Sequence, residues 1–305
     1  MLFTHLQVDG RYPYDTVVIP LTVEALKLLL CTLLLAHAFL TSRGKDKDFQ
    51  PRVTLDWRSF LKFSVPGLCY MVSNNCTFVI IGELGATSFQ VLANLKILVT
   101  ALLMRVLLSR RISWLRWKAL VLLVLGAMVT QLGGEQGALR GSFLGYVAVA
   151  LSSLMSGLAG VYSEKLLKGD ASGPARNDSI YWQNIQLYIF GIIFGMLALH
   201  SKRMAAAADA GAGDQAVLEP GGVFDGFNMM AYLCVLSIAL SGMLVSAVLK
   251  YIDNIAKCFV AAVSLVVVAA FGTLSGKEEP SINILIGIVL VALALEQYNL
   301  PQTIE

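Results

Sequence analysis

The sequence predicts an all-α membrane protein with about nine transmembrane helices. Its 305 residues are 57% hydrophobic and only 14% charged, whereas charged residues make up about 25% of a typical soluble domain. The mean hydropathy is +0.71. A helix needs about 20 mostly apolar residues to cross a bilayer. The segments that meet this criterion are residues 16–40, 60–81, 86–108, 113–132, 142–166, 180–200, 229–250, 255–274 and 281–299.

The short links and the small residues of these segments predict how they pack. Residues 109–112 alone separate the third and fourth segments, and the polar string at residues 250–257 separates the seventh and eighth, so we expect antiparallel neighbours. Small residues at helix-packing spacing let helices approach closely in lipid. They are Gly141 and Gly145, Gly191 and Gly195, and Ser152, Ser156, Gly157 and Gly160. In the first segment, the three-residue spacing of Glu24 and Lys27 favours a self-neutralising pair over a proton relay.

Charge and motif content exclude several functions. A net charge of +3 is too small to indicate a nucleic acid partner. The sequence has no GxxxxGK phosphate-binding loop, which disfavours ATP-driven transport. The three histidines are scattered and the five cysteines lie in apolar segments without metal-ligand spacing. We therefore predict no metal, no cofactor and no catalytic residues, and we interpret the protein as a non-enzyme.

The loops differ in positive charge, which predicts their orientation. Cytoplasmic loops are enriched in lysine and arginine, so residues 41–58, 109–112 and 167–179 and the C-terminus are placed in the cytoplasm. Residues 1–15 and 201–228 then face the opposite compartment, and the small-residue tract in 201–228 is read as a flexible lumenal loop. With this orientation, the sequon at Asn177 is predicted to be unmodified.

The polar string at residues 250–257 is the most informative candidate site. Charged groups are costly inside or near a bilayer and often mark a solute pathway. Lys250, near the end of a helix, is suited to hold a phosphate. The alternative is a charged hairpin in which Asp253 neutralises Lys250 or Lys257.

Two further candidates come from the second and third segments. Lys96 lies midway along residues 86–108, so its ammonium group must reach the membrane surface, pair with a carboxylate or face a water-filled cavity. Asn75 follows Pro66-Gly67, which can kink a membrane helix and expose backbone groups. The alternative for Asn75 is a hydrogen bond between helices.

The remaining candidates are suited to a nucleoside. Asn184 and Tyr188 are four residues apart and therefore share one helix face. An amide and a phenol can read a pyrimidine edge and a ribose. Tyr162 can stack on a base, although its neighbourhood is also typical of a cytoplasmic helix end. We count Lys250, Asn184, Tyr188, Lys96, Asn75 and Tyr162 as the candidate substrate-binding residues.

Several of these strings together resemble the nucleotide-sugar transporters of the drug/metabolite transporter superfamily, in the branch of CMP-sialic acid, UDP-galactose and UDP-N-acetylglucosamine carriers. The matching strings, in family order, are Asn74-Asn75, Gln90-Val91 with Leu95-Lys96-Ile97, Ala159-Gly160-Val161-Tyr162 with Glu164-Lys165, Asn184-Ile185-Gln186, and Lys250-Tyr251 with Asp253-Asn254. Each string is short, so the resemblance rests on their order and their placement on helices.

The resemblance implies ten helices in two inverted repeats around a central cavity. The first repeat would cover about residues 16–132 and the second about 141–300, and the family's opening helix has no counterpart before Glu24. It also implies that residues matching Asn184 and Tyr188 contact the nucleotide, and that the lysine matching Lys250 faces the phosphate.

Two departures from the family pattern concern the substrate. A basic residue near the phosphate is replaced by Trp114, for which Arg111 or Arg116 is a candidate substitute. The positions before Lys96 that are typically Tyr, Tyr and Gln in animal members are Phe89, Ala93 and Asn94. This change alters the expected contacts with the sugar, so the sugar remains open.

The leading hypothesis is an antiporter in the Golgi or endoplasmic reticulum membrane. It would exchange a cytosolic UDP- or CMP-linked sugar for a lumenal nucleoside monophosphate, with the lipid bilayer as its surroundings and a homodimer as a possible assembly. One alternative is a general exporter of metabolites or drugs on the same fold. The other is a non-transporting membrane scaffold, which a genuine lack of the opening helix would favour.

Overall fold

The structure, a computed structural model, describes residues 18–42, 50–130, 142–168, 178–210, 227–274 and 282–300. Across these ranges the regular structure is helical, apart from a single bridge between Arg52 and Asp178. The predicted all-α fold class is confirmed. The predictions for Gly141, Asn177 and residues 1–15 lie outside the described residues.

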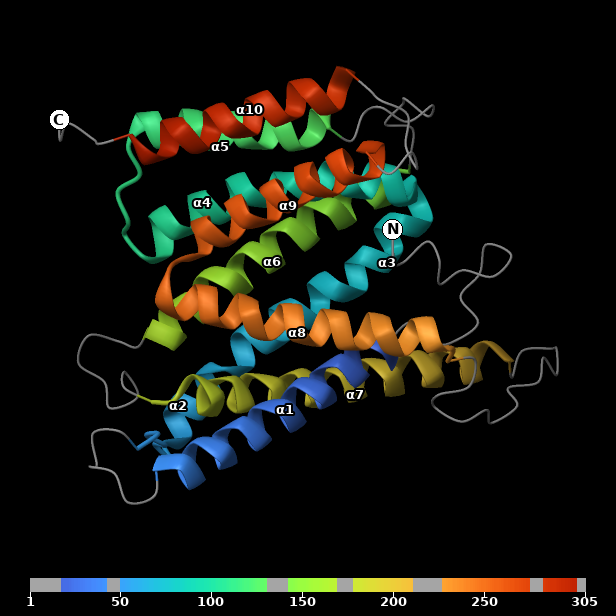
Figure 1. Ribbon diagram of the computed structural model, residues 1–305. Coiled ribbons are helices and arrows are strands. Elements are labelled where there is room, and N and C mark those ends of the chain that lie inside the picture. Colours follow the sequence, from blue (N-terminus) through green and yellow to red (C-terminus); the bar gives the residue numbers. More distant parts are fainter. Residues whose placement is uncertain are drawn as a thin grey trace. The chain divides into compact units, whose positions relative to one another are not determined.

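Each of the predicted membrane segments corresponds to helical structure (Figure 1). By length and composition, seven helical spans among the described residues are long and apolar enough to cross a membrane. The 86–108 segment comprises the end of α3, a 3₁₀ turn and the short helix α4. The elements are α1 (Val18–Ser42), α2 (Trp57–Lys62), α3 (Ser64–Leu92), η2 (Ala93–Leu95), α4 (Lys96–Leu107), α5 (Trp114–Val129), α6 (Phe143–Lys168), α7 (Ile180–Ala210), α8 (Met229–Tyr251), α9 (Asn254–Leu274) and α10 (Ile282–Asn299).

The chain forms two compact units that are interleaved in sequence. Unit 1 comprises Met1–Asn75 and Lys165–Lys250, and unit 2 comprises Cys76–Glu164 and Tyr251–Glu305. Unit 1 therefore takes one part from each of the predicted repeats, 16–132 and 141–300, whereas unit 2 takes one part from the first and two parts from the second. The repeats themselves stay a prediction.

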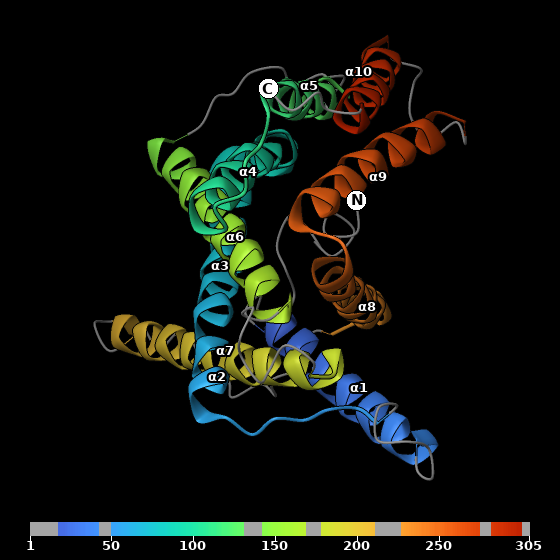
Figure 2. The same ribbon diagram turned by 90° about the vertical axis from the view of Figure 1, so that its left-hand side faces the viewer.

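In unit 1, α1 lies along α7 (Figure 2), and glycines allow the close approach. A Cβ at Gly191 would lie 2.9 Å from Glu24 Oε2, and one at Gly195 would lie 3.1 Å from Leu21 Cδ1. On α3, a Cβ at Gly67 would lie 3.0 Å from Phe190 Cβ. The packing role predicted for Gly191 and Gly195 is confirmed.

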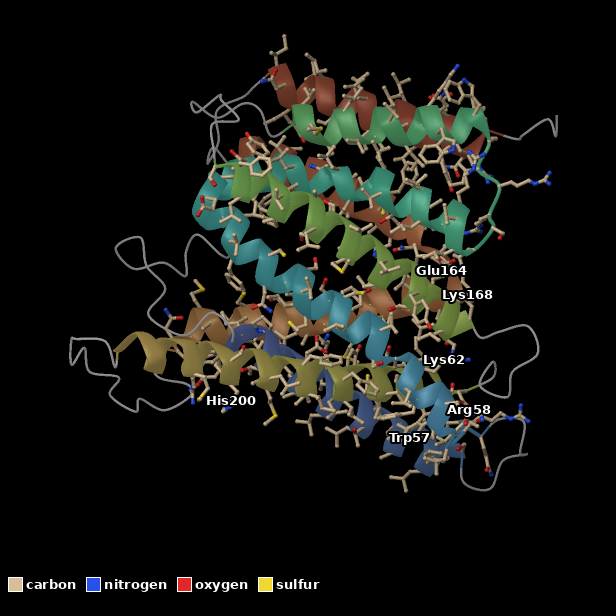
Figure 3. The ribbon with its side chains drawn as sticks, turned by 180° about the vertical axis from the view of Figure 1, so that it is seen from behind. Trp57, Arg58, Lys62, Glu164, Lys168 and His200 are labelled. Carbon is tan, nitrogen blue, oxygen red and sulfur yellow. The ribbon has the colours of Figure 1, made fainter. Side chains whose placement is uncertain are left out.

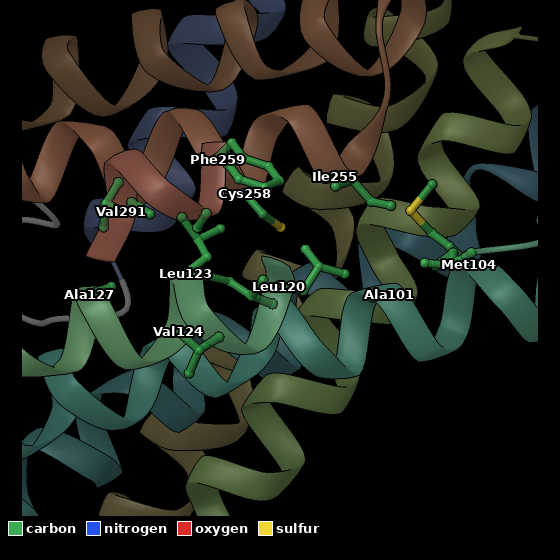
Figure 4. Close-up of a cluster of buried hydrophobic side chains, with 14 of the residues drawn as sticks. Ala101, Met104, Leu120, Leu123, Val124, Ala127, Ile255, Cys258, Phe259 and Val291 are labelled. Atoms are coloured by element: carbon green, nitrogen blue, oxygen red, sulfur yellow. The ribbon is translucent and has the colours of Figure 1, made fainter. Parts of the chain in front are cut away.

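Unit 2 has an apolar core formed by α4, α5, α9 and α10 (Figure 4). Leu120, Leu123 and Val124 of α5 pack there with Phe259 and Val291. Helices α5 and α10 lie side by side. The close contacts of this pair use Gly126, where a Cβ would lie 2.9 Å from Leu290 Cβ, and Gly287, where it would meet Thr130.

The structure corrects one boundary and refines another. Residues 201–210 of the predicted loop 201–228 are helical, because α7 continues to Ala210. An alanine tract has the highest helix propensity, so Ala205–Ala208 extend the helix instead of ending it. Residues 211–226 lie outside the described range.

At Pro66, the helix break falls just before the proline, at Phe63 between α2 and α3, since proline is tolerated in the first turn of a helix.

Within α3, Gly85 makes a sharp break at φ 80° and ψ 161°. This backbone region is accessible essentially only to glycine, and other residues pay about 1–3 kcal/mol there. Gly85 thus separates the second predicted membrane segment from the third.

Gly85→Ala is expected to lower the free energy of unfolding by about 1–3 kcal/mol, measured by thermal unfolding in detergent. Gly82→Ala is the matched control, because a Cβ at either position meets nothing within 4 Å. Gly82 has helical backbone, so alanine there is expected to be neutral or stabilising by up to about 1 kcal/mol. Equal behaviour of the two variants would contradict the assigned strain.

Candidate functional site

In unit 1, Asn184 and Tyr188 lie one turn apart on α7 and are almost fully buried, at 2% and 1% exposure. Among the described residues, neither Asn184 Oδ1 nor the Tyr188 hydroxyl has a hydrogen-bond partner. Cys31 and Ser246 are close neighbours of the two side chains, but the Ser246 hydroxyl donates to the Gly242 carbonyl in its own helix. Buried polar groups in native proteins are usually hydrogen-bonded, so this pair has unused capacity for a polar ligand.

An ion pair on α1 borders Tyr188. Lys27 Nζ lies 2.6 Å from Glu24 Oε1 and 4.4 Å from the centroid of the Tyr188 ring. The absence of a side chain at Gly242 on α8 leaves room for the Lys27 stem, since a Cβ there would lie 3.2 Å from Lys27 Cδ. The predicted pairing of Glu24 with Lys27 is confirmed. Its position beside Tyr188 was not predicted, because the residues are distant in sequence.

Lys250, the leading phosphate candidate, joins the end of α8 to the start of α7. Its ammonium group donates to the Asp178 carbonyl and to Gln183 Oε1, each at 2.6 Å. The same end of the unit is tied further by Thr54, whose hydroxyl donates to Asp178 Oδ1 at 2.7 Å. Trp182 Nε1 donates to the Thr54 carbonyl at 3.0 Å. Lys250 has a structural role here, and phosphate binding by Lys250 stays a prediction.

The basic side chains Arg58 and Lys62, with Trp57, lie on α2 at one end of unit 1, while His200 lies toward the other end of α7 (Figure 3). The orientation in the membrane stays a prediction.

Asn75 and Tyr162 are both half-buried. The Asn75 amide donates to the Met71 carbonyl at 2.8 Å, one turn earlier in its own helix. This hydrogen bond lies within α3 and not between helices. It uses the amide nitrogen, so Asn75 Oδ1 is the atom that can accept a hydrogen bond from a ligand. Tyr162 lies on α6, and its stacking role stays a prediction.

In unit 2, Lys96 and Lys257 lie close enough to interact electrostatically. Lys96 is exposed although it lies midway along residues 86–108. Gly160 on α6 leaves space for the ammonium group of Lys257, since a Cβ at Gly160 would lie 2.9 Å from Lys257 Nζ. In the part of the chain that the structure describes, neither lysine forms a salt bridge. Thr100 and Cys258 complete the immediate surroundings.

The carboxylates near this lysine pair have other hydrogen-bond partners, and Glu164 also interacts electrostatically with Lys257. Asp253 accepts from Arg110 at 3.1 Å and from the Ala256 backbone N–H at 2.7 Å. Glu164, 3% exposed, accepts from the Asn254 backbone N–H at 2.9 Å and lies 3.8 Å from Arg110. The alternative in which Asp253 neutralises Lys250 or Lys257 is therefore wrong. Asp253 instead caps α9 and pairs with the link between α4 and α5, because that link brings Arg110 to it.

The side-chain amide of Asn254 is fully buried beside these groups, at 0% exposure. Neither its oxygen nor its nitrogen has a hydrogen-bond partner among the described residues. A Cβ at Gly160 would lie 2.7 Å from Asn254 Nδ2, so this glycine is what admits the amide next to Lys257. Sequence reasoning identified the string containing Asn254 and Lys257, but placed the ligand at Lys250.

Trp114 carries no positive charge and cannot itself replace the basic residue that the family has near the phosphate. Its indole is 74% exposed. Of the two arginines considered as substitutes, Arg116 lies over the Tyr298 ring at 5.1 Å, and Arg111 is exposed on the link before α5. No group of three or more possible metal ligands occurs among the described residues.

A polytopic helical protein with unpaired ammonium groups and unsatisfied amides inside its helices has the features of a membrane transporter for a polar, anionic solute. The sequence comparisons identify the class further. The profile of the nucleotide-sugar transporter family matches residues 1–299, and the chain belongs to this family. The family transports its substrates, so the interpretation as a non-enzyme agrees with it.

Characterised relatives include carriers of two different nucleotide sugars. The chain is 32% identical to CMP-sialic acid transporter 1 of Arabidopsis thaliana, over 99% of this chain and 85% of the relative. It is also 32% identical to CMP-sialic acid transporter 1 of Oryza sativa subsp. japonica, over 99% and 89%. Identity to the Homo sapiens UDP-galactose translocator is 35%, over 92% of this chain and 68% of the relative.

Proposed function

We propose that this transporter exchanges a cytosolic pyrimidine nucleotide sugar for a lumenal nucleoside monophosphate across the Golgi or endoplasmic reticulum membrane. CMP-sialic acid and UDP-galactose, named in the similar proteins, both carry a pyrimidine base and at least one phosphate. A nucleoside monophosphate shares the base and the phosphate, so the same groups can bind either solute.

The observation that carries the proposal is the pair Lys96 and Lys257 in unit 2. Two ammonium groups that interact electrostatically repel each other, and the repulsion becomes stronger when the site is closed off from water. A phosphate placed between them relieves the repulsion and forms charge-assisted hydrogen bonds. We assign the phosphate to Lys96 and Lys257 in preference to Lys250, because Lys250 would first have to give up its bonds to Asp178 and Gln183.

Asn254 extends this phosphate cradle. Its amide nitrogen can donate to a phosphate or ribose oxygen, and its amide oxygen can accept from a ribose hydroxyl. A local shift of the Asn254 side chain would present these atoms, which have no partner among the described residues. Leaving such an amide buried and unsatisfied is costly, so a ligand that satisfies it gains affinity.

For the nucleoside we propose Asn184 and Tyr188 in unit 1, as the sequence predicted. Asn184 Oδ1 can accept from the exocyclic amine of cytosine or the N3–H of uracil. The Tyr188 hydroxyl can donate to a ribose oxygen or a base carbonyl. The Glu24–Lys27 ion pair, with Lys27 over the Tyr188 ring, borders this pair of residues without adding net charge.

Exchange follows from the electrostatics of the lysine pair. With no anion bound, occluding Lys96 and Lys257 from water would strand two like charges in low dielectric. A bound nucleotide neutralises these charges, so the loaded transporter converts between its cytosol-facing and lumen-facing conformations more readily than the empty one. Exchange is then favoured over one-way transport.

The decisive test is counterflow into proteoliposomes that contain the purified protein. Vesicles preloaded with CMP or UMP are expected to take up a labelled CMP- or UDP-linked sugar at least about 10-fold faster than empty vesicles, because return of the empty carrier is disfavoured. Vesicles preloaded with AMP serve as a control for base selectivity. Equal uptake by empty and preloaded vesicles would exclude obligatory exchange, and no uptake of any nucleotide sugar would exclude the proposed substrate class.

A further inference from the structure

The region around the start of α5 carries excess positive charge. Residues 105–125 contain five basic residues and no aspartate or glutamate. Arg110 is engaged by Glu164 and Asp253, and Arg116 lies over the Tyr298 ring. Three exposed basic side chains remain, Arg105 on α4 and Arg111 and Lys118 near the start of α5, and among the described residues none of them has a carboxylate partner.

Lys118 belongs to a face of α5 that protein does not cover. Trp114, Lys118, Val121 and Leu125 follow one another at spacings of four, three and four residues, which places them on one helix face. All four are exposed, Trp114 at 74%, Val121 at 44% and Leu125 at 49%. Helices α9 and α10 pack against other faces of α5, so in a bilayer this face contacts lipid.

The depth of these residues fits a lipid headgroup. From Leu125 to Trp114 the helix rises ~16 Å, about half of a hydrocarbon core. A tryptophan at the end of a lipid-facing stripe is typical of the membrane–water interface. Lys118 Nζ lies 5.8 Å from the centroid of the Trp114 ring, so the ammonium group and the indole lie together at that level.

The start of α5 adds a favourable field. Ser113 caps the helix by accepting from the Arg116 N–H at 3.4 Å. The N-terminus of a helix carries partial positive charge, which favours an anion near its first turn. Arg111, in the link directly before this turn, adds a full charge beside it.

We propose that Arg111, Trp114 and Lys118 bind the phosphate of an anionic phospholipid headgroup at the membrane surface. The occupant is a lipid and not a soluble phosphate, because the cations continue directly into the exposed apolar side chains of the same helix face. A soluble phosphate would contact only the cations, whereas a phospholipid also contacts the apolar side chains through its acyl chains. Arg111, considered above as a substitute for the basic residue missing at Trp114, is assigned to the lipid instead, and none of the three residues belongs to the proposed nucleotide-sugar site.

The test is native mass spectrometry of the full-length protein in detergent, titrated with phosphatidylserine and, separately, with phosphatidylcholine. A cation near an anionic membrane surface contributes about 1 kcal/mol, or roughly five-fold in affinity. The double variant R111Q/K118Q is therefore expected to bind phosphatidylserine about 25-fold more weakly and phosphatidylcholine as before. Lys165→Gln, which neutralises an exposed lysine in the last turn of α6, is the matched control and should leave binding unchanged.

Three outcomes would overturn the proposal. One is equal phosphatidylserine binding by the wild type and by R111Q/K118Q, with both proteins equally stable to heat. Another is full competition by glycerophosphoserine, which has the headgroup without acyl chains and would indicate a soluble anion site. The third is a change of the double variant from dimer to monomer without loss of lipid affinity, which would assign this face to a second copy of the chain.

Discussion

Lys257→Gln is expected to lower the transport efficiency, the maximal rate of nucleotide-sugar uptake divided by KM, by about 30-fold or more. Removing one partner of a desolvated, hydrogen-bonded charge pair typically costs about 2–5 kcal/mol, and each 1.4 kcal/mol corresponds to about a factor of ten. Lys96→Gln should have an effect of similar size, because both ammonium groups are assigned to the same phosphate. Initial rates of counterflow into preloaded proteoliposomes, measured over a range of substrate concentrations, give this value.

Two comparison variants make this result specific. Lys165→Gln removes an exposed lysine outside the proposed site and should retain uptake. Lys250→Gln separates the two assignments of the phosphate ligand. If Lys250 only ties α8 to the start of α7, the variant should lose thermal stability more than it loses affinity. Wild-type uptake by Lys257→Gln at equal amounts of folded protein, together with a loss of about 30-fold or more in Lys250→Gln, would restore the assignment made from the sequence.

Glu24→Gln is expected to destabilise the protein by about 3 kcal/mol. Lys27 is 9% exposed, and the substitution leaves its ammonium group buried without its carboxylate partner. Glutamine keeps the shape of glutamate, so the close contact of this side chain with Gly191 is preserved. The measurement is the free energy or the midpoint temperature of unfolding in detergent.

The double variant E24Q/K27M distinguishes a stranded charge from lost packing. Replacing both members of a buried ion pair by groups of similar shape is often close to neutral. The double variant should therefore recover most of the stability lost in Glu24→Gln. A loss as large as in the single variant would show that the 2.6 Å contact contributes mainly through packing.

The helices could be predicted from the sequence because the length and apolarity of a membrane-spanning helix are local properties. The packing glycines were predictable for the same reason, and Gly191 and Gly195 do face α1. The end of α7 was missed because its alanines also fit a loop of small residues. In water or at a membrane surface their helix propensity decides the outcome.

Apart from the pair Glu24 and Lys27 within one helix turn, the partners of charged residues could not be predicted, because they depend on contacts between segments far apart in the chain. One reading of the string paired Asp253 with Lys250 or Lys257, yet Asp253 pairs with Arg110, which lies 143 residues away in sequence. Lys250 and Lys257 are seven residues apart and would share a face of one continuous helix. The helix ends at Tyr251 and α9 begins at Asn254, so the two lysines belong to different units. The shared helix face of Asn184 and Tyr188, in contrast, could be predicted from their spacing within one helix, and their role in binding stays a prediction.

The interleaving of the two units has a consequence for biogenesis. Neither unit is complete until its second sequence segment has been synthesised. Helix α5 ends at Val129 and its neighbour α10 begins at Ile282, about 150 residues later, which corresponds to roughly 10–30 s of translation. During that time the face of α5 that contains Gly126 is in the membrane without its permanent neighbour. The nascent chain must therefore depend on lipid or on membrane chaperones to shield α5 until the C-terminal helix arrives.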